Sequence, residues 1–99
     1  MGTLVEQQRV VEVVGELDLS SVARTREQLH DALAAEPAQL VVDLSRCTFV
    51  DASALSMLLD VHRRAWRTGS VLTLRGCSPR VLRLLSLTGL RRVFDVEAA

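Results

Sequence analysis

An aspartate followed two residues later by a serine, at the start of a predicted helix, is the pattern in this chain with the clearest chemical potential. Asp51 and Ser53 follow an apolar run at 40–42, and an apolar-faced helix pattern extends from Ala52 to about Arg67. Asp51 is the natural N-cap, because its carboxylate can accept hydrogen bonds from the free N–H groups of the first turn. Ser53 then lies at the positive end of the helix, where a phosphate on its hydroxyl would be stabilised.

The other reactive residue types form no catalytic pattern. His30 and His62 do not stand at metal-ligand spacings with cysteines or carboxylates. The five glycines form neither a GxGxxG nor a Walker loop, and Ser53 has no Gly-x-Ser-x-Gly context. Asp18 and Asp51 could hold a cation if they lay close together, although carboxylates at helix starts more often act as caps. We therefore expect a protein that is not an enzyme and that needs no cofactor or metal.

The composition is typical of a folded chain without an excess of either charge. Of 99 residues, 48% are hydrophobic, which is enough for a packed core in one domain over residues 1–99. Twelve basic residues balance twelve acidic ones, which argues against a nucleic-acid-binding protein. No apolar run approaches the roughly 18 residues that span a bilayer, and the first residues lack a signal-peptide pattern. We expect a cytoplasmic protein that binds neither nucleic acid nor membrane.

Two cysteines each follow a predicted strand, so both could lie at the same edge of a sheet. Cys47 and Cys77 are expected to stay reduced in the cytoplasm and to act as small, partly buried hydrophobic residues. A disulfide or a shared metal ion between them is the alternative.

Predicted strands and helices alternate along the chain. Apolar and β-branched runs predict strands at 4–8, 9–14, 39–44, 71–74 and 92–96. Helix-period patterns and caps predict helices at 22–35, 52–67 and 78–89, with the segment 45–50 as a connection. This alternation predicts an α/β fold with a mostly parallel four- to five-stranded sheet and three main helices, with or without a short fourth helix at the C-terminus. The unbroken apolar run at 39–44 predicts burial on both faces.

The helix that starts at Ala52 has two distinct faces. Its apolar face is predicted to point inward and includes Leu55, Leu58, Leu59, His62 and Trp66. Its opposite face, which we call the polar ridge, consists of Ser53, Ser56, Asp60, Arg63 and Arg67. The polar ridge is either an ordinary solvated face or a surface that binds a partner.

The strand ends predict where the polar residues gather. Ligands and partners of parallel sheets concentrate at the carboxyl ends of the strands, so we expect Asp18, Asp43 and the loop 51–53 to converge there. Asp18, Ser20 and Ser21 are all able to cap the helix that follows them, and the sequence does not choose between them.

Several stretches together resemble the STAS domain family. They are Gly15-Glu16-Leu17-Asp18, Val42-Asp43-Leu44-Ser45, Phe49-Val50-Asp51-Ala52-Ser53-Ala54-Leu55, Ser78-Pro79-Arg80-Val81 and Leu87-Thr88-Gly89-Leu90. The resemblance covers roughly residues 4–96 and is greatest to the bacterial anti-sigma factor antagonists. In that group the pattern is Asp-Ser-Ser-Gly-Leu, and a partner kinase phosphorylates the second serine. Ser53 matches this serine, whereas Ala52 replaces the first serine and Ala54 replaces the glycine.

The resemblance implies a regulatory binding protein. Its partner would be an anti-sigma factor with serine kinase activity, and a phosphatase would remove the phosphate from Ser53. The implied partner-binding residues are Asp18, Asp51, Ala52, Ser53, Ser56, Asp60 and Arg63. Ser56 and Thr48 are weaker candidates for phosphorylation.

Two alternatives remain open at this level. STAS-like domains also serve as non-switching subunits or scaffolds of larger assemblies, such as stress-signalling complexes and bacterial lipid transporters. Ala52 and Ala54 favour this alternative mildly, because they depart from the kinase-substrate pattern. The other alternative is nucleotide binding or weak catalysis near Asp18 and Asp51.

Overall fold

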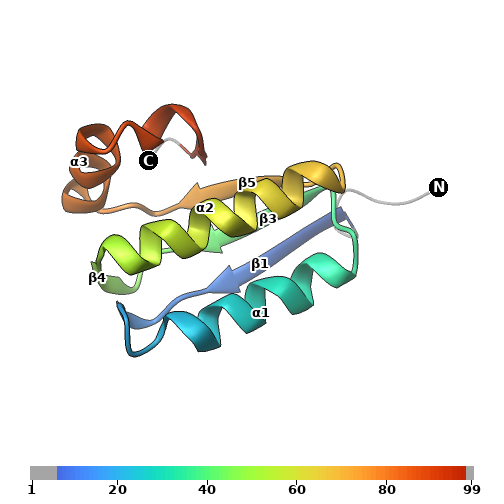
Figure 1. Cartoon of the computed structure of the whole chain (residues 1–99), viewed down its shortest axis with the longest axis horizontal. Coiled ribbons are helices and arrows are strands. Elements are labelled where there is room, and N and C mark those ends of the chain that lie inside the picture. Colours follow the sequence, from blue (N-terminus) through green and yellow to red (C-terminus); the bar gives the residue numbers. More distant parts are fainter. Residues whose placement is uncertain (1–6, 98–99) are drawn as a thin grey trace.

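Strands and helices alternate in the computed structural model, which describes residues 7–97 (Figure 1). In chain order the elements are β1 (Gln8–Glu12), β2 (Gly15–Leu17), α1 (Val22–Ala34), β3 (Gln39–Asp43), β4 (Cys47–Val50), α2 (Ala52–Arg67), β5 (Val71–Arg75), α3 (Pro79–Leu87), the 3-10 helix η2 (Leu90–Arg92) and β6 (Asp95–Val96). The three predicted helices are confirmed. The strand predicted at 4–8 lies mostly outside the described residues.

The strands form one larger and one smaller parallel sheet. The larger sheet has the order β1-β3-β5-β6, and every neighbouring pair in it is parallel. The smaller sheet pairs β2 with β4, also in parallel. α1 and α2 lie side by side over the larger sheet (Figure 1). The predicted α/β fold with a parallel sheet and three helices is therefore confirmed.

The core lies between the larger sheet and the helices. At the centre of the sheet, Leu40, Val41 and Val42 are all 0% exposed, which confirms that β3 is buried on both faces. Leu40 and Val42 belong to the core cluster that also includes buried residues of all three α-helices. A row of side-chain hydrogen bonds crosses the sheet from Gln8 through Gln39 and Thr73 to Asp95, with distances of 2.8, 2.9 and 2.6 Å.

The predicted connection at 45–50 was wrong in part, because Cys47–Val50 form the strand β4. The first long strand, predicted at 9–14, ends at Glu12, and Gly15 begins β2 after an irregularity in register. Gly15 has a φ of +85°, a conformation that glycine adopts readily, and its N–H donates to the carbonyl of Arg46 at 3.0 Å. In β4 only Cys47 and Val50 are buried, so the strand lacks the alternation that would have marked it.

The prediction that Trp66 points inward was also wrong, because its side chain is 72% exposed. The buried line of α2 runs through Ala54, Leu58, Val61 and Ala65, at spacings of four, three and four residues. One residue further along, a helix has turned by about 100°. Trp66 therefore points away from the core, and the small Ala65 fills the inward position.

The ends of the helices follow the predicted signals. Asp51 and Ser78 cap α2 and α3 through their side chains, and Pro79 is the first residue of α3. The strand predicted at 92–96 is shorter than expected, because η2 occupies its first residue and β6 contains only Asp95–Val96. Within residues 7–97, no helix combines the length and apolar character needed to cross a membrane.

Candidate functional site

Asp51 connects three parts of the chain at the start of α2. Its backbone is extended, as expected of an N-cap, and its Oδ1 accepts a hydrogen bond from the N–H of Ala54 at 3.0 Å. The same oxygen accepts a hydrogen bond from the Ser53 hydroxyl at 2.6 Å. The other oxygen, Oδ2, accepts one from the N–H of Leu19, in the loop between β2 and α1, at 3.1 Å. The N-cap prediction for Asp51 is confirmed.

These hydrogen bonds determine the charge state of the site. The Ser53 hydroxyl, followed by the Ala54 and Leu19 N–H groups, holds the pKa of Asp51 below its ordinary value of 3.8, because each bond stabilises the ionised carboxylate. Asp51 is therefore charged at neutral pH. Since the Ser53 hydroxyl directs its proton to this carboxylate, the lone pairs of its oxygen are available for attack on an incoming phosphoryl group.

Two exposed apolar side chains share a hollow with Asp51. Leu19 is 77% exposed and Phe49 is 43% exposed. Together with Asp18, Ser20 and Asp51, they line a shallow hollow of about 430 Å³. Ser53, whose hydroxyl donates to Asp51, is itself partly exposed. Asp51 therefore connects a partly exposed serine to a small apolar surface. Leu19 and Phe49 were not predicted as site residues, because no local pattern marks an isolated apolar side chain as exposed.

Asp18 lies in the same hollow but has its own partners. Its Oδ1 accepts hydrogen bonds from the N–H and the hydroxyl of Ser20, at 3.0 and 2.6 Å. These bonds, led by the hydroxyl, lower the pKa of Asp18 from its ordinary value. Ser21 is the N-cap residue of α1, although no side chain caps this helix. Asp18 thus stabilises the loop before α1 and does not cap the helix.

The expected convergence of aspartates is only partly observed. Asp18 and Asp51 line one hollow. Asp43 instead accepts hydrogen bonds from the N–H and the hydroxyl of Ser45, at 2.9 and 2.7 Å, and so stabilises the turn between β3 and β4. Within residues 7–97, no three His, Cys, Asp or Glu side chains are grouped so that they could hold a metal ion.

The polar ridge is exposed beyond Ser53, but it extends over two separate surfaces. Ser56, Asp60 and Arg63 are all exposed. Asp60 and Arg63 form a long ion pair of 4.0 Å and line a different hollow, between α1 and α2. Ten residues separate Ser53 from Arg63, which corresponds to about 15 Å along the helix at 1.5 Å per residue. The polar ridge therefore connects the serine site to a second surface.

The two cysteines are free thiols. The Cys47 thiol is buried and donates a hydrogen bond to the carbonyl of Phe49 at 3.3 Å. Burial raises the pKa of the Cys77 thiol, which favours its neutral form. These features fit the prediction of small, partly buried side chains.

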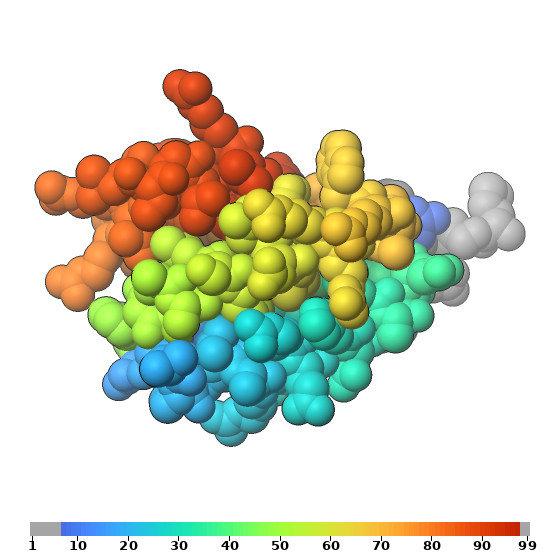
Figure 2. All heavy atoms as spheres, in the orientation of Figure 1, coloured from blue at the N-terminus to red at the C-terminus, as the bar shows by residue number. Residues whose placement is uncertain are grey.

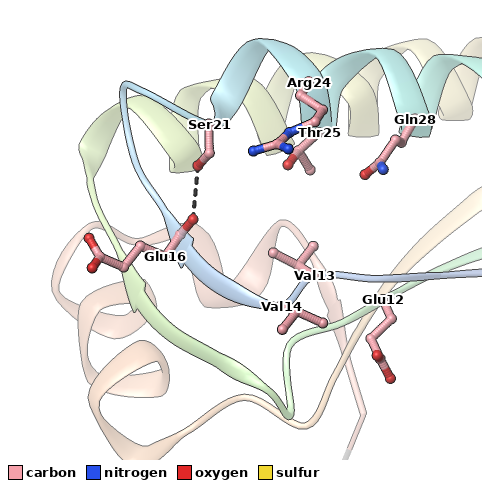
Figure 3. A pocket seen from close by; sticks show the side chains of 8 residues that line it. All are labelled: Glu12, Val13, Val14, Glu16, Ser21, Arg24, Thr25 and Gln28. Carbon is pink, nitrogen blue, oxygen red and sulfur yellow. Dashed lines mark hydrogen bonds between the residues drawn. The ribbon is translucent and has the colours of Figure 1, made fainter.

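A third hollow, of about 230 Å³, lies between the β1–β2 segment and α1 (Figure 3). In the figure Arg24, Thr25 and Gln28 extend from α1 toward the strands, while the carboxylates of Glu12 and Glu16 turn away. Arg24 is the single cationic side chain among the lining residues. One cation without a glycine-rich loop is a poor cradle for the phosphates of a nucleotide.

Comparison with known proteins places this geometry in a family. The family model described as "Mlab, STAS domain" matches residues 3–95. The anti-sigma-B factor antagonist of Bacillus subtilis is 31% identical over 88 residues, which make up 89% of this chain and 80% of that protein. A STAS-domain-containing protein of Pseudomonas aeruginosa is 29% identical over 91 residues, which make up 92% of this chain and 89% of that protein.

The fold agrees with the sequence matches. The crystal structure of an anti-sigma factor antagonist from Mycobacterium paratuberculosis aligns with a TM-score of 0.80 at 28% sequence identity. The alignment covers 94% of this chain and 79% of that one. Because the family model spans almost the whole sequence and the architecture agrees with it, this chain belongs to the STAS domain family.

Proposed function

We propose that this protein is an anti-sigma factor antagonist. In this proposal it binds an anti-sigma factor that is also a serine kinase, and the sequestered partner releases its sigma factor. Phosphorylation of Ser53 then switches the antagonist off, and a phosphatase restores it. The observation that carries the proposal is the partly exposed Ser53 at the N-terminus of α2, whose hydroxyl donates to Asp51, a residue that shares a hollow with two exposed apolar side chains.

The proposed docking surface surrounds Ser53. It comprises Asp18, Asp51, Ala52, Ser53 and Ser56, with Leu19 and Phe49 as apolar contacts and with Asp60 and Arg63 at its far edge. Apolar side chains at the centre of a polar surface are typical of sites that bind a protein partner. The protein would act by binding, while the partner would hold the ATP.

Phosphorylation would act through Asp51. A phosphate adds about 1.5 to 2 negative charges at neutral pH, on an oxygen that lies 2.6 Å from Asp51 Oδ1. The hydroxyl proton is lost, so a hydrogen bond is replaced by repulsion between like charges. Asp51 then turns away from the phosphate, and the Leu19 N–H loses its acceptor. The switch would therefore change both the charge and the shape of the docking surface.

The core would be unaffected by this change. Backbone N–H groups at a helix N-terminus can bind the phosphate in place of the carboxylate. Next to the serine, Ala54 and Leu55 are buried and keep α2 packed on the sheet. The modified protein should therefore stay folded while its affinity for the partner falls.

Labelling by a kinase tests the acceptor residue. The purified protein is incubated with a candidate anti-sigma factor kinase and ATP, and the phosphate is mapped by mass spectrometry. We expect one phosphate on Ser53 and none on the Ser53→Ala variant. Ser56→Ala is the matched control, because this serine is exposed one turn further along the same helix. Full labelling of Ser53→Ala would contradict the assignment.

A binding experiment tests the switch itself. The affinity of Ser53→Ala for the anti-sigma factor should lie within about threefold of the wild-type affinity. The affinity of Ser53→Asp should be at least about tenfold weaker, because this variant places a carboxylate beside Asp51. Calorimetry or surface plasmon resonance measures both affinities, and circular dichroism verifies that each variant is folded.

A non-switching STAS subunit or scaffold of a larger assembly is the second candidate function. It is favoured by Ala52 and Ala54 at the two positions flanking Ser53, which differ from the pattern of the kinase substrates. Ala54 is fully buried, so its methyl group is part of the core. If Ser53→Ala and Ser53→Asp both bind the native partner as well as wild type, the switch is refuted and the non-switching subunit is favoured.

A further inference from the structure

An exposed tryptophan lies among arginines at the opposite end of α2 from Ser53. Trp66 is 72% exposed and is the single tryptophan of the chain. Together with His62, Arg63, Arg67 and Val93, it lines a hollow of about 430 Å³. Figure 2 shows the yellow-to-orange C-terminal half of α2 with side chains projecting from the surface of the molecule.

The hollow between α1 and α2 that Asp60 and Arg63 line adjoins the hollow beside Trp66. It has a volume of about 350 Å³ and is lined by Arg26, His30, Asp60, Arg63, Arg64 and Arg67. Arg63 and Arg67 line both hollows and separate them. We call the two hollows, with these two arginines between them, the distal surface. Arg67 lies 14 residues from Ser53, about 21 Å along the helix.

The distal surface gathers positive charge on a chain that is neutral as a whole. The whole sequence has twelve basic and twelve acidic residues, yet four arginines gather here with one aspartate. Within residues 7–97, Asp60 is the only carboxylate within 4.0 Å of one of these four guanidinium groups, and it contacts Arg63 at that limit. Arg64 and Arg67 are favourable at the C-terminus of α2 because of the helix dipole. The dipole does not account for Arg26 on α1 or for an exposed indole.

We infer that the distal surface is a second docking site, which adjoins the surface around Ser53 at Asp60 and Arg63, for an acidic amphipathic helix of a partner protein. Tryptophan and arginine are the residue types most enriched among the strongest contacts of protein interfaces. Arg63 and Arg67 stand one helical turn apart, so they match two carboxylates spaced four residues apart on a helix lying alongside. The hollow beside Trp66 and Val93 accepts an apolar side chain from the same helix. The protein would thus hold two partners at opposite ends of one helix.

The concave shape of the distal surface favours a protein segment over a lipid surface. The two hollows lie on either side of Arg63 and Arg67, and this shape fits separate side chains better than a flat bilayer. Guanidinium groups bind carboxylates and phosphates alike with two parallel hydrogen bonds, so the shape of the surface, and not its charge, separates the two kinds of ligand.

Fluorescence of the single tryptophan tests the inference directly. The probe is a 16-residue alanine-based helical peptide with two glutamates four residues apart and a leucine on the same face. We expect a saturable blue shift of the Trp66 emission, and an affinity at least tenfold weaker for the same peptide with glutamine in place of glutamate. Increasing the salt concentration should weaken binding of the glutamate peptide.

Variants of the protein give the second part of the test. Arg26→Glu combined with Arg67→Glu should weaken binding at least tenfold, while Arg80→Glu combined with Arg83→Glu, an equal change of charge on exposed positions of α3, should leave it unchanged. Ser53→Asp should bind the peptide like wild type, which separates this site from the proposed switch. Circular dichroism verifies the fold of each variant.

Several outcomes would overturn the inference. Equal binding of the glutamate and glutamine peptides, or no binding of either, would contradict an acidic ligand. Equal loss of binding in the α3 control would show a general charge effect. A shift of the Trp66 emission with phosphatidylglycerol vesicles, without a shift with the peptide, would assign the distal surface to a membrane.

Discussion

At the scale of single residues, Asp51 links the serine, the first turn of α2 and the loop at Leu19. One carboxylate oxygen serves the helix and the Ser53 hydroxyl, and the other serves the Leu19 N–H. All three hydrogen bonds are stronger to the ionised form. Any change that neutralises Asp51, or that places a negative charge beside it, should therefore loosen all three contacts together.

Acid should destabilise the protein partly through this residue. The folded-state pKa of Asp51 lies below its ordinary value of 3.8. The stabilisation is therefore fully present above the unfolded-state pKa and is lost as the pH falls through the folded-state pKa. We expect the urea midpoint, followed by circular dichroism, to fall as the pH is lowered through 3.8 and below, and to fall less in Asp51→Asn.

Two comparisons make this test specific. Asp18 and Asp43 also have lowered pKa values because of hydrogen bonds from Ser20 and Ser45, so part of the acid sensitivity should remain in Asp51→Asn. Asp60→Asn is the control, because this exposed carboxylate has only a long contact with Arg63. An identical pH dependence of Asp51→Asn and wild type would contradict the role assigned to Asp51.

At the scale of elements, the turn after β5 supports the turn that leads into β4. The Leu44 N–H donates to the carbonyl of Arg75 at 2.8 Å. Gly76 has a φ of +69°, and a Cβ on it would lie 2.7 Å from Ser45 Cβ and 2.9 Å from the backbone of Ser45. Since β4 leads directly to Asp51, this glycine helps to position the serine site.

Substituting Gly76 should lower the free energy of unfolding by more than the strain of its positive φ alone would. We expect Gly76→Ala to lower the free energy of unfolding by about 2–3 kcal/mol, because strain adds to a collision with Ser45. Gly69→Ala is the matched control: Gly69 has a similar φ of +81° but no atom within 4 Å of an added Cβ, so about 1 kcal/mol is expected. Urea denaturation measures both values, and equal losses would refute the packing argument.

The sequence predicted the elements whose signals are local. α2 was predicted from its helical periodicity and from Asp51, and α3 from Ser78 and Pro79, because caps and periodic faces depend on neighbouring residues. The strands β2 and β4 were missed because each is short and is stabilised mainly by pairing with the other, about 30 residues away. Trp66 was misplaced because a broad apolar stripe does not reveal which of its edges faces the sheet.

The candidate site could be predicted to a similar degree. Asp51 and Ser53 are two residues apart, so the sequence alone was enough to place a hydroxyl beside a capping carboxylate. The contact of Asp51 with Leu19 joins residues 32 positions apart, and only the fold brings them together. The surface made by Leu19 and Phe49 likewise joins distant segments. The approach of Arg26 to the C-terminal half of α2 depends on the packing of α1 against α2.

At the scale of the whole molecule, the central part of the sheet and its C-terminal edge differ in how firmly they are held. β3 pairs with β1 and with β5 over five residues each, and its central side chains are buried. β6 pairs with β5 through only two residues and follows the three-residue helix η2. Short pairing and exposed backbone lower the free energy of local opening. The C-terminal edge should therefore open without unfolding the centre.

Hydrogen exchange followed by mass spectrometry measures this difference and also tests the switch. We expect the slowest exchange in β3 and faster exchange in β6 and η2. In Ser53→Asp, the loop at Leu19 and the first turn of α2 should exchange faster than in wild type, because Asp51 releases both, while exchange in β3 stays the same. Faster exchange in β3 would mean that a charge at position 53 unfolds the domain. A switch that acts only on the docking surface requires the centre of the sheet to be insensitive to that charge.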